Sequence, residues 1–339
     1  MQVVITPHAL MAPIHHRDVD LNDFLLHYRL LTFLSRNDEF FSSHVFSDTV
    51  EILSDNNLFP AFKTFNDYLV LKELEDEVSA YDLVRLFNNV MENCEDIRDL
   101  HDIHEFEISD GFSFPQVTST PICNNFTNNS IALCSYIEMT KEVKLLPLLD
   151  DNVTSDSYNY EIPEITALDK GEFMEMSGFE TNIALYKSCT DLMKFYSPSD
   201  LWRKSVTDFS YKLAIFYKCK DISFSQNEGT RASICLDSFD IGQRFVESLN
   251  THQCSGSGRF AMTLLDSIAR LLLEEPKNEV KVFATSAGGT TPRTRGQDIA
   301  FRLHVTKSGE GLRLMFWRKS CGTIELANVA NKSEIVIYE

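Results

Sequence analysis

Glycine is distributed very unevenly along this 339-residue chain, and that distribution limits where tight turns can form. Ten of the thirteen glycines lie between Gly229 and Gly322. Charge divides at nearly the same place: residues 240–339 hold 13 Lys and Arg against 11 Asp and Glu, net +2, and residues 1–239 hold 18 against 39, net −21. The sequence therefore predicts two different domains, an acidic one over 1–225 and a weakly basic one over 230–339.

Composition limits the class of protein. An apolar content of 43% is enough for a core in each domain. No run approaches 18 apolar residues, and the first residues lack the pattern of a signal peptide, so we expect a cytoplasmic chain without membrane contact. The eight cysteines are scattered with no C-x-x-C pair, which argues against a thiolate metal site and a disulfide framework. No cofactor or metal is expected.

The acidic region reads as mainly helical. Apolar residues near a 3.6-residue period predict helices over about 21–34, 46–57, 61–73 and 80–93. Short apolar runs between about 103 and 165, among them SIALCSYIEM and EVKLLPLL, predict a small antiparallel sheet inserted at that point. Helices are expected again over 180–196 and 199–208. Overall, an α+β fold is predicted.

The basic region shows a clearer order of elements. Strands are predicted over 212–219 and 232–239, followed by helices over 239–250 and 258–275. Five short runs then predict strands in EVKVF, IAFRLHVT, GLRLMFW, TIELANV and EIVIY, which ends at Tyr338. Two helices would cover one face of an antiparallel sheet, with Ile268, Leu314, Phe316 and Leu326 in its core.

Alternation in two of these strands separates charged from apolar side chains. Arg302 and His304 fall on one face, and Arg313 and Trp317 fall on the same face of the next strand. If helices cover the other face, this face is open, Trp317 is at least partly exposed, and the surface could hold RNA through phosphates and stacked bases. The other interpretation is an ordinary solvated sheet face, which needs polar residues in any case.

The last hundred residues carry a resemblance. A helical hairpin from about Ser238, the pair Arg293 and Arg295, and the run FRLHVTKSGEGLRLMFWRKSCGTIELANVANKSEIVIYE together resemble the RelE/ParE toxin superfamily. RelE-like members are ribosome-dependent endoribonucleases that cut mRNA without metal, whereas ParE-like members poison a topoisomerase. The first branch implies an RNA-binding protein or a metal-independent endoribonuclease with RNA or the ribosome as partner, and the second implies no cleavage; a retained fold with lost or altered catalysis is also open.

Carried over by position, the resemblance implies a set of site residues. The catalytic residues would be Arg302, His304, Arg313 and Tyr338, with Glu334 as an alternative to His304 as acid or base. Nucleic acid would contact Arg293, Arg295, Lys307, Trp317 and Arg318. The segment before Tyr338 departs from the pattern, because it is apolar where active members often have basic residues or histidine.

Two further histidine motifs give weaker evidence of a functional site. Neither motif has a full set of metal ligands, so solvated or structural roles are favoured for both. The first is His101-x-x-His104 with Glu105 and Glu107, and the second is His15-His16 with Asp18 and Asp20. No nucleotide-hydrolysing motif is present.

Two functions remain open. One is a toxin-like, RNA-acting C-terminal domain that the acidic region recruits or masks. The other is a non-catalytic interaction subunit of a multi-protein assembly in bacterial antiviral defence, with a protein partner.

Overall fold

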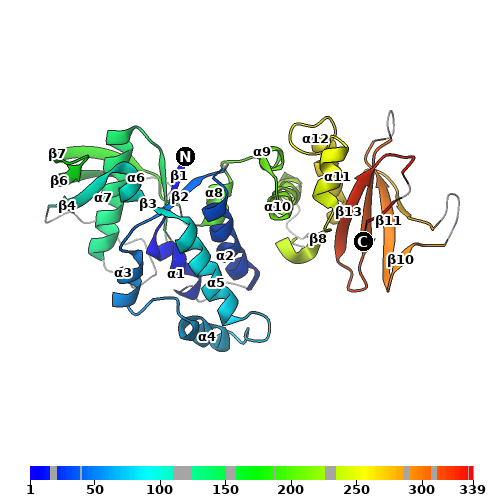
Figure 1. The fold of residues 1–339 in the computed structure, drawn as a ribbon, viewed down its shortest axis with the longest axis horizontal. Helices are drawn as coiled ribbons and strands as arrows, with labels where there is room; N and C mark the ends of the chain where they lie inside the picture. Colours follow the sequence, from blue (N-terminus) through cyan, green and yellow to red (C-terminus); the bar gives the residue numbers. More distant parts are fainter. Residues whose placement is uncertain are drawn as a thin grey trace. The chain divides into compact units, whose positions relative to one another are not determined.

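The computed structural model describes residues 1–15, 21–38, 40–109, 122, 124–149, 158–186, 188–225, 234–285, 291–306, 311–334 and 336–338. The chain forms two compact units, Met1–Phe195 and Tyr196–Glu339. Within the described residues the architecture is a mixture of helices and several sheets, which confirms the α+β class (Figure 1).

A parallel sheet that the sequence did not predict lies in the N-terminal unit. Its strand order is β3-β2-β1-β5, made of β1 (Gln2–Ile5), β2 (Ser42–Val45), β3 (Glu95–Asp96) and β5 (Leu145–Leu148). Only β5 lies in a predicted strand, EVKLLPLL, but it joins this parallel sheet and not the predicted antiparallel one. The other three strands have only two to four residues each, which is too short for a hydrophobic period to be visible.

Helices connect these strands. They are α1 (Pro7–His15), α2 (Leu21–Arg36), α3 (Thr49–Asp55), α4 (Phe62–Leu71), α5 (Ala80–Asn93), α6 (Ile97–His101) and, near the end of the unit, α8 (Cys189–Met193). The four helices predicted between residues 21 and 93 are confirmed by α2, α3, α4 and α5. The helix predicted over 180–196 is wrong, because its first residues belong to a strand and only α8 is helical.

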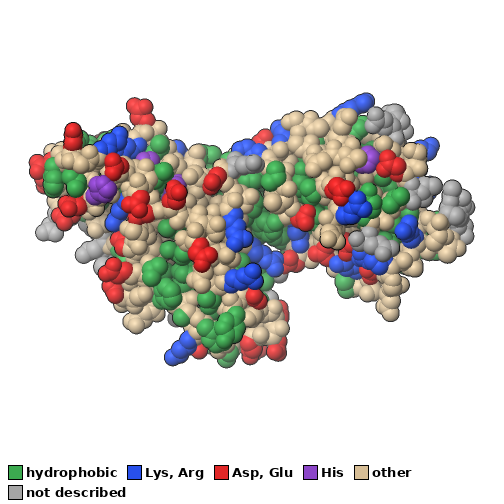
Figure 2. Space-filling view, viewed as in Figure 1, with side chains coloured by type: hydrophobic (Ala, Val, Ile, Leu, Met, Phe, Trp, Pro, Cys, Tyr) green, Lys and Arg blue, Asp and Glu red, His purple; other side chains and the backbone are tan. Residues whose placement is uncertain are grey.

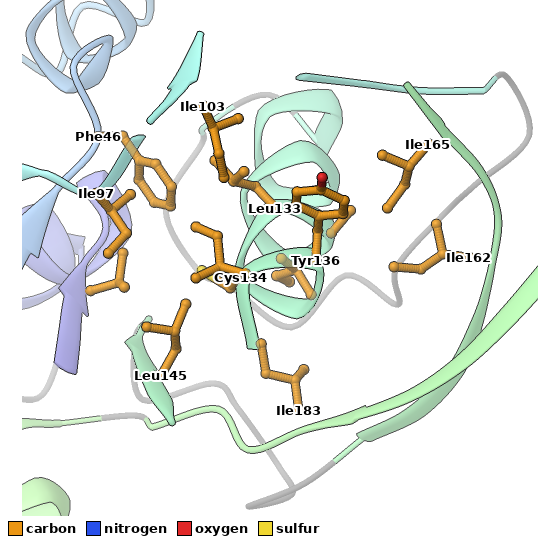
Figure 3. Packing of buried hydrophobic residues seen from close by; sticks show 14 of the residues in the cluster. Phe46, Ile97, Ile103, Leu133, Cys134, Tyr136, Leu145, Ile162, Ile165 and Ile183 are labelled. Atoms are coloured by element: carbon orange, nitrogen blue, oxygen red, sulfur yellow. The ribbon is translucent and has the colours of Figure 1, made fainter. Parts of the chain in front are cut away.

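A second, antiparallel sheet has the order β4-β6-β7, made of β4 (Ile103–Ile108), β6 (Tyr158–Asp169) and β7 (Glu172–Ile183). Helix α7 (Asn124–Lys141) packs in a core with residues of both sheets: Leu133, Cys134 and Tyr136 lie between Leu145 and Ile162 and their neighbours (Figure 3). The prediction of a strand in SIALCSYIEM is therefore wrong. A helix covered on most sides has no one-sided apolar stripe, so its sequence looks like that of a buried strand.

The C-terminal unit begins with helices and ends with a sheet. Its elements are α9 (Pro198–Lys204), α10 (Asp208–Ser225), a 3₁₀ turn (Leu236–Ser238), β8 (Phe239–Ile241), α11 (Phe245–Thr251), α12 (Ala261–Leu272), β9 (Val280–Val282), β10 (Thr294–Arg295), β11 (Asp298–His304), β12 (Arg313–Arg318) and β13 (Ile324–Ala330). The strand order is β10-β11-β12-β13-β8, with β9 also paired to β11; β8 runs parallel to β13 and the other pairs are antiparallel.

Three predicted strands of this unit are wrong. Of the described residues in the segment 232–239, three form the 3₁₀ turn and only Phe239 belongs to a strand. Residues 212–219 lie inside α10, which contacts α9 and α12 and is buried on most of its surface, as α7 is. The segment ending at Tyr338 forms no strand over its described residues. The division between the units also falls earlier in the chain than the glycine and charge boundary, because α9 and α10 pack on α12.

Candidate functional site

Both faces of the C-terminal sheet are covered over much of their area. The residues predicted for the core, Ile268, Leu314, Phe316 and Leu326, are all fully buried, which confirms that face. The opposite face carries a second small core of Phe283, Ala300, Met315, Trp317, Ala327, Ala330 and Ile337. Only part of this second face is therefore available to a ligand.

Trp317 corrects the prediction of an exposed aromatic residue. Its side chain is fully buried, and its indole Nε1 donates a hydrogen bond to the backbone oxygen of Tyr338 at 2.7 Å. The C-terminal segment lies over this face: Ile337 packs in the second core, and the Asn328 side chain bonds the backbone of Val336 and Tyr338. Trp317 cannot stack on a base while this segment is in place.

Arg295 belongs to the same internal structure. Its guanidinium lies 4.9 Å from the centre of the Trp317 ring and donates two hydrogen bonds of 2.9 Å to the carboxylate of Glu325. A third bond, of 3.1 Å, reaches Asp298, and these carboxylates raise the pKa of the guanidinium. Bidentate pairing of this kind fixes the arginine in place, so Arg295 stabilises the sheet and has little capacity left for a phosphate.

The other end of this face gathers positive charge. Strand pairing places His304 directly opposite Arg313 and Arg302 directly opposite Lys281, so that three adjacent strands contribute to one surface. We call the group the cationic cluster; it consists of Lys281, Arg302, His304, Arg313 and Lys332. Burial first, and then the positive charges of the four other members, lower the pKa of His304. The imidazole is therefore neutral at pH 7.

Within the described ranges, the two arginines of the cluster have no carboxylate partner. Arg313 is only 8% exposed, and its Nη1 donates a hydrogen bond to the backbone oxygen of Lys332 at 3.1 Å. The Nε atoms of Arg302 and Arg313 are buried without any hydrogen-bond partner. Burial, and then the charge of Arg302, lower the pKa of Arg313. Buried polar groups almost always have partners, so this pair is an unusual local excess of positive charge.

A shallow pocket of about 360 Å³ adjoins the cluster. It is lined by Lys277, Asn278, Glu279, Lys281 and His304. Glu279 forms an exposed ion pair of 2.9 Å with Lys281, and it is the one carboxylate in the pocket lining. Asn278 holds the strand end in place by donating a 2.6 Å hydrogen bond to the backbone oxygen of His304. An anionic group of modest size could therefore reach the imidazole and Lys281 from solvent.

The remaining residues suggested by the sequence lie elsewhere. The Tyr338 ring stacks on the guanidinium of Arg244 at 4.2 Å, and Glu334 pairs with His252 at 3.4 Å. Arg318 is exposed on the opposite face, over the ring of Phe301. Arg293 is half-buried, with its backbone bonded to Phe283. Lys307 lies outside the described residues.

Sequence reasoning missed Lys281 and Lys332. Lys281 could have been found, because extending the alternation of Arg302 and His304 to the strand EVKVF puts its single lysine on the same face. Lys332 follows β13 in a turn, where no alternation applies. The sequence therefore identified three members of the cluster, Arg302, His304 and Arg313, but neither lysine.

The two histidines of the motif His101-x-x-His104 have partners within the N-terminal unit. Among the residues whose placement is described, no group of three or more His, Cys, Asp or Glu could hold a metal ion. His101 bonds the side chain of Gln2 at 3.0 Å, and His104 pairs with Asp102 at 2.9 Å. His16, Asp18 and Asp20 lie outside the described residues. None of the helices in the described ranges is both long enough and apolar enough to cross a bilayer.

Comparisons with known proteins do not extend this picture: the chain matches no family profile, no curated protein and no solved structure.

Proposed function

We propose that the C-terminal unit binds single-stranded RNA through the cationic cluster. The observation that carries the proposal is the pair Arg302 and Arg313, which hold two buried and unpartnered Nε donors on one sheet face. A phosphate supplies the negative charge and the acceptors that both guanidinium groups lack. Lys281 and Lys332 would contact neighbouring phosphates along the strand.

Cleavage of that RNA is the second step of the proposal. A neutral His304 between arginines can accept the proton of a ribose 2′-hydroxyl, while the arginines stabilise the charge on phosphorus. The 2′-oxygen bonds to phosphorus, the bond to the 5′-oxygen breaks, and that oxygen leaves with a proton from solvent. The products are a 2′,3′-cyclic phosphate and a 5′-hydroxyl, and no metal takes part.

The resemblance to RelE-like toxins supports this chemistry only in part. Arg302, His304 and Arg313 lie together, whereas Tyr338 stacks on Arg244 and Trp317 is internal. RNA binding through phosphates therefore has more support than base recognition by aromatic stacking. The N-terminal unit would recruit or restrain this activity.

Binding can be measured by the fluorescence anisotropy of a labelled single-stranded RNA with the full-length protein at several salt concentrations. With four cations engaged, the logarithm of the association constant should fall with the logarithm of salt concentration with a slope of about −3. Arg302→Ala and Arg313→Ala should each weaken binding, and each should reduce the slope by about 0.7. Arg318→Ala is the matched control, because this exposed arginine lies on the opposite face.

Cleavage has a separate readout. RNA, free or on ribosomes, is incubated with the protein in EDTA, and its ends are analysed for 2′,3′-cyclic phosphate. His304→Ala should abolish the products but leave the salt slope unchanged, because the histidine is neutral. If RNA binds equally well to the wild type, Arg302→Ala and Arg318→Ala, the proposal fails, and the cluster is reassigned to an acidic protein surface, as in the interaction-subunit alternative.

A further inference from the structure

The antiparallel sheet of the N-terminal unit has an exposed and strongly acidic outer side. Its inner side packs on α7 through Ile162, Ile165 and Ala167. We call the outer side the acidic face; its carboxylates are Glu105, Glu107, Glu161, Glu164, Glu175 and Glu180, all exposed. Acidic side chains are seen over β4, β6 and β7 in the space-filling view (Figure 2).

The acidic face is not neutralised by its surroundings. Across the described part of the unit, none of its six carboxylates has a hydrogen bond or an ion pair, although Lys170 lies at the tip of the hairpin. Glu161 stands directly opposite Glu180 on the neighbouring strand. Like charges in directly opposed positions destabilise a sheet.

On the inner side of the same sheet, a mostly buried carboxylate has hydrogen-bond partners. The carboxylate of Asp169 is mostly buried, and it accepts hydrogen bonds from Lys141 at 2.5 Å and from the hydroxyl of Tyr136 at 2.9 Å. The Lys141 and Tyr136 hydrogen bonds lower the pKa of this carboxyl against the opposing effect of burial, which is the largest single influence. The six unpaired carboxylates of the acidic face lie on the outer side, where a partner can reach them.

The chain therefore presents two uncompensated surfaces of opposite sign. Counting only residues whose placement is described, the cationic cluster has no carboxylate beside it apart from Glu279, and the acidic face has no lysine or arginine apart from Lys170. We propose that the acidic face of one copy of the chain docks on the cationic cluster of a second copy and competes there with RNA. This inference rests on the proposed function for the competition, but the docking itself requires only the cluster.

A second copy is a suitable occupant for two reasons. Each copy carries one acidic face and one cluster, so association of copies supplies the two surfaces in equal number, as symmetric self-association requires. The acidic face also offers apolar area, since Phe173 is 67% exposed in the row Glu105, Leu168 and Phe173. Complementary charge mainly directs such an encounter and makes it sensitive to salt.

Self-association is measured by sedimentation equilibrium of the full-length protein at low and high salt. We expect a dimer at low salt that dissociates at high salt. The double variant Glu161→Gln with Glu180→Gln should weaken the dimer by roughly five- to tenfold, the effect of losing two exposed ion pairs. The variant Glu75→Gln with Glu77→Gln removes the same charge from exposed positions outside the acidic face, and it should dimerise like the wild type.

Contact between chains is tested directly by carbodiimide, which joins lysine amines to carboxylates that touch. A mixture of unlabelled and ¹⁵N-labelled protein distinguishes links between chains from links within one. We expect links between chains that join Lys281 or Lys332 to the acidic face. Links confined to one chain, or a monomer at every salt concentration, would overturn docking on a second copy.

RNA affinity separates this inference from the proposed function. The variant Glu161→Gln with Glu180→Gln should bind RNA several-fold more tightly than the wild type, and the variant Glu75→Gln with Glu77→Gln should not. A salt-sensitive dimer in a protein that binds no RNA would support the docking and refute the proposed function. RNA binding that depends on Arg302 but is equal in both glutamine variants would refute the competition and leave the proposed function standing.

Discussion

Replacing Arg302 with methionine should stabilise the C-terminal unit, although it removes a residue of the proposed site. Arg302 and Arg313 are diagonal neighbours on adjacent strands, because Arg302 pairs with Met315, two residues along from Arg313. Diagonal positions lie about 7–8 Å apart, so the repulsion between the two charges is about 0.5–2 kcal/mol for an effective dielectric constant between about 80 and 20. The methionine retains the apolar stem and removes the charge, and the buried Nε of Arg302 has no hydrogen bond with the described residues that would be lost.

The expected gain is measured by thermal unfolding followed by tryptophan fluorescence. Both tryptophans, Trp202 and Trp317, belong to the C-terminal unit, so the signal reports on that unit alone. The midpoint should rise by roughly 2–8 °C at low salt, and the difference should shrink in 0.5 M salt, where charge is screened. Arg318→Met on the opposite face should shift the midpoint little. If Arg302→Met lowers the midpoint at low salt, the charge of Arg302 is compensated in solution and the reasoning is refuted.

Three further perturbations test the two units. Burial lowers the pKa of His8 to about 3, so between pH 6.5 and 3 the unfolded chain binds a proton that the native unit does not, and stability falls with falling pH by about 1.4 kcal/mol per unit. His8→Gln should remove that contribution, measured by urea unfolding followed by circular dichroism, and an unchanged pH dependence would show that His8 is protonated in the native state. Phe316→Ala should lower the unfolding free energy of the C-terminal unit by about 3–5 kcal/mol, and a loss below 1 kcal/mol would contradict its fully buried position. Ile337→Ala should loosen the segment over Trp317 and shift its fluorescence to longer wavelength, whereas an unchanged spectrum would mean that Ile337 does not shield the indole.

The sequence predicted helices where burial is one-sided. In α5, buried Leu83, Phe87 and Val90 recur at helical spacing while the opposite side is solvated, so the period is visible. Helices α7 and α10 are buried on most sides, and parts of their sequences predict strands. These two helices differ from α5 in their tertiary surroundings rather than in local helix propensity. A single sequence does not show which residues will surround a helix.

Sequence-based prediction of the candidate site is limited in the same way. Alternation determines that Arg302, His304 and Arg313 share a face with Trp317, and strand pairing agrees. Alternation does not determine what covers that face. The segment ending at Tyr338 resembles a further strand in its sequence, but it crosses the sheet and buries Trp317.

The same covering segment has opposite consequences for aromatic and charged residues. A tryptophan gains free energy when it is buried, provided that its indole N–H finds a partner, and the Tyr338 oxygen is that partner. An arginine loses free energy when it is buried without a carboxylate, and Arg313 has only a backbone oxygen. Among the residues that the structure describes, neither pairing nor packing compensates the charge of Arg302 and Arg313, so both guanidinium groups retain the capacity to bind an anion. That asymmetry is why the arginines, and not the aromatic residues, carry the proposed function.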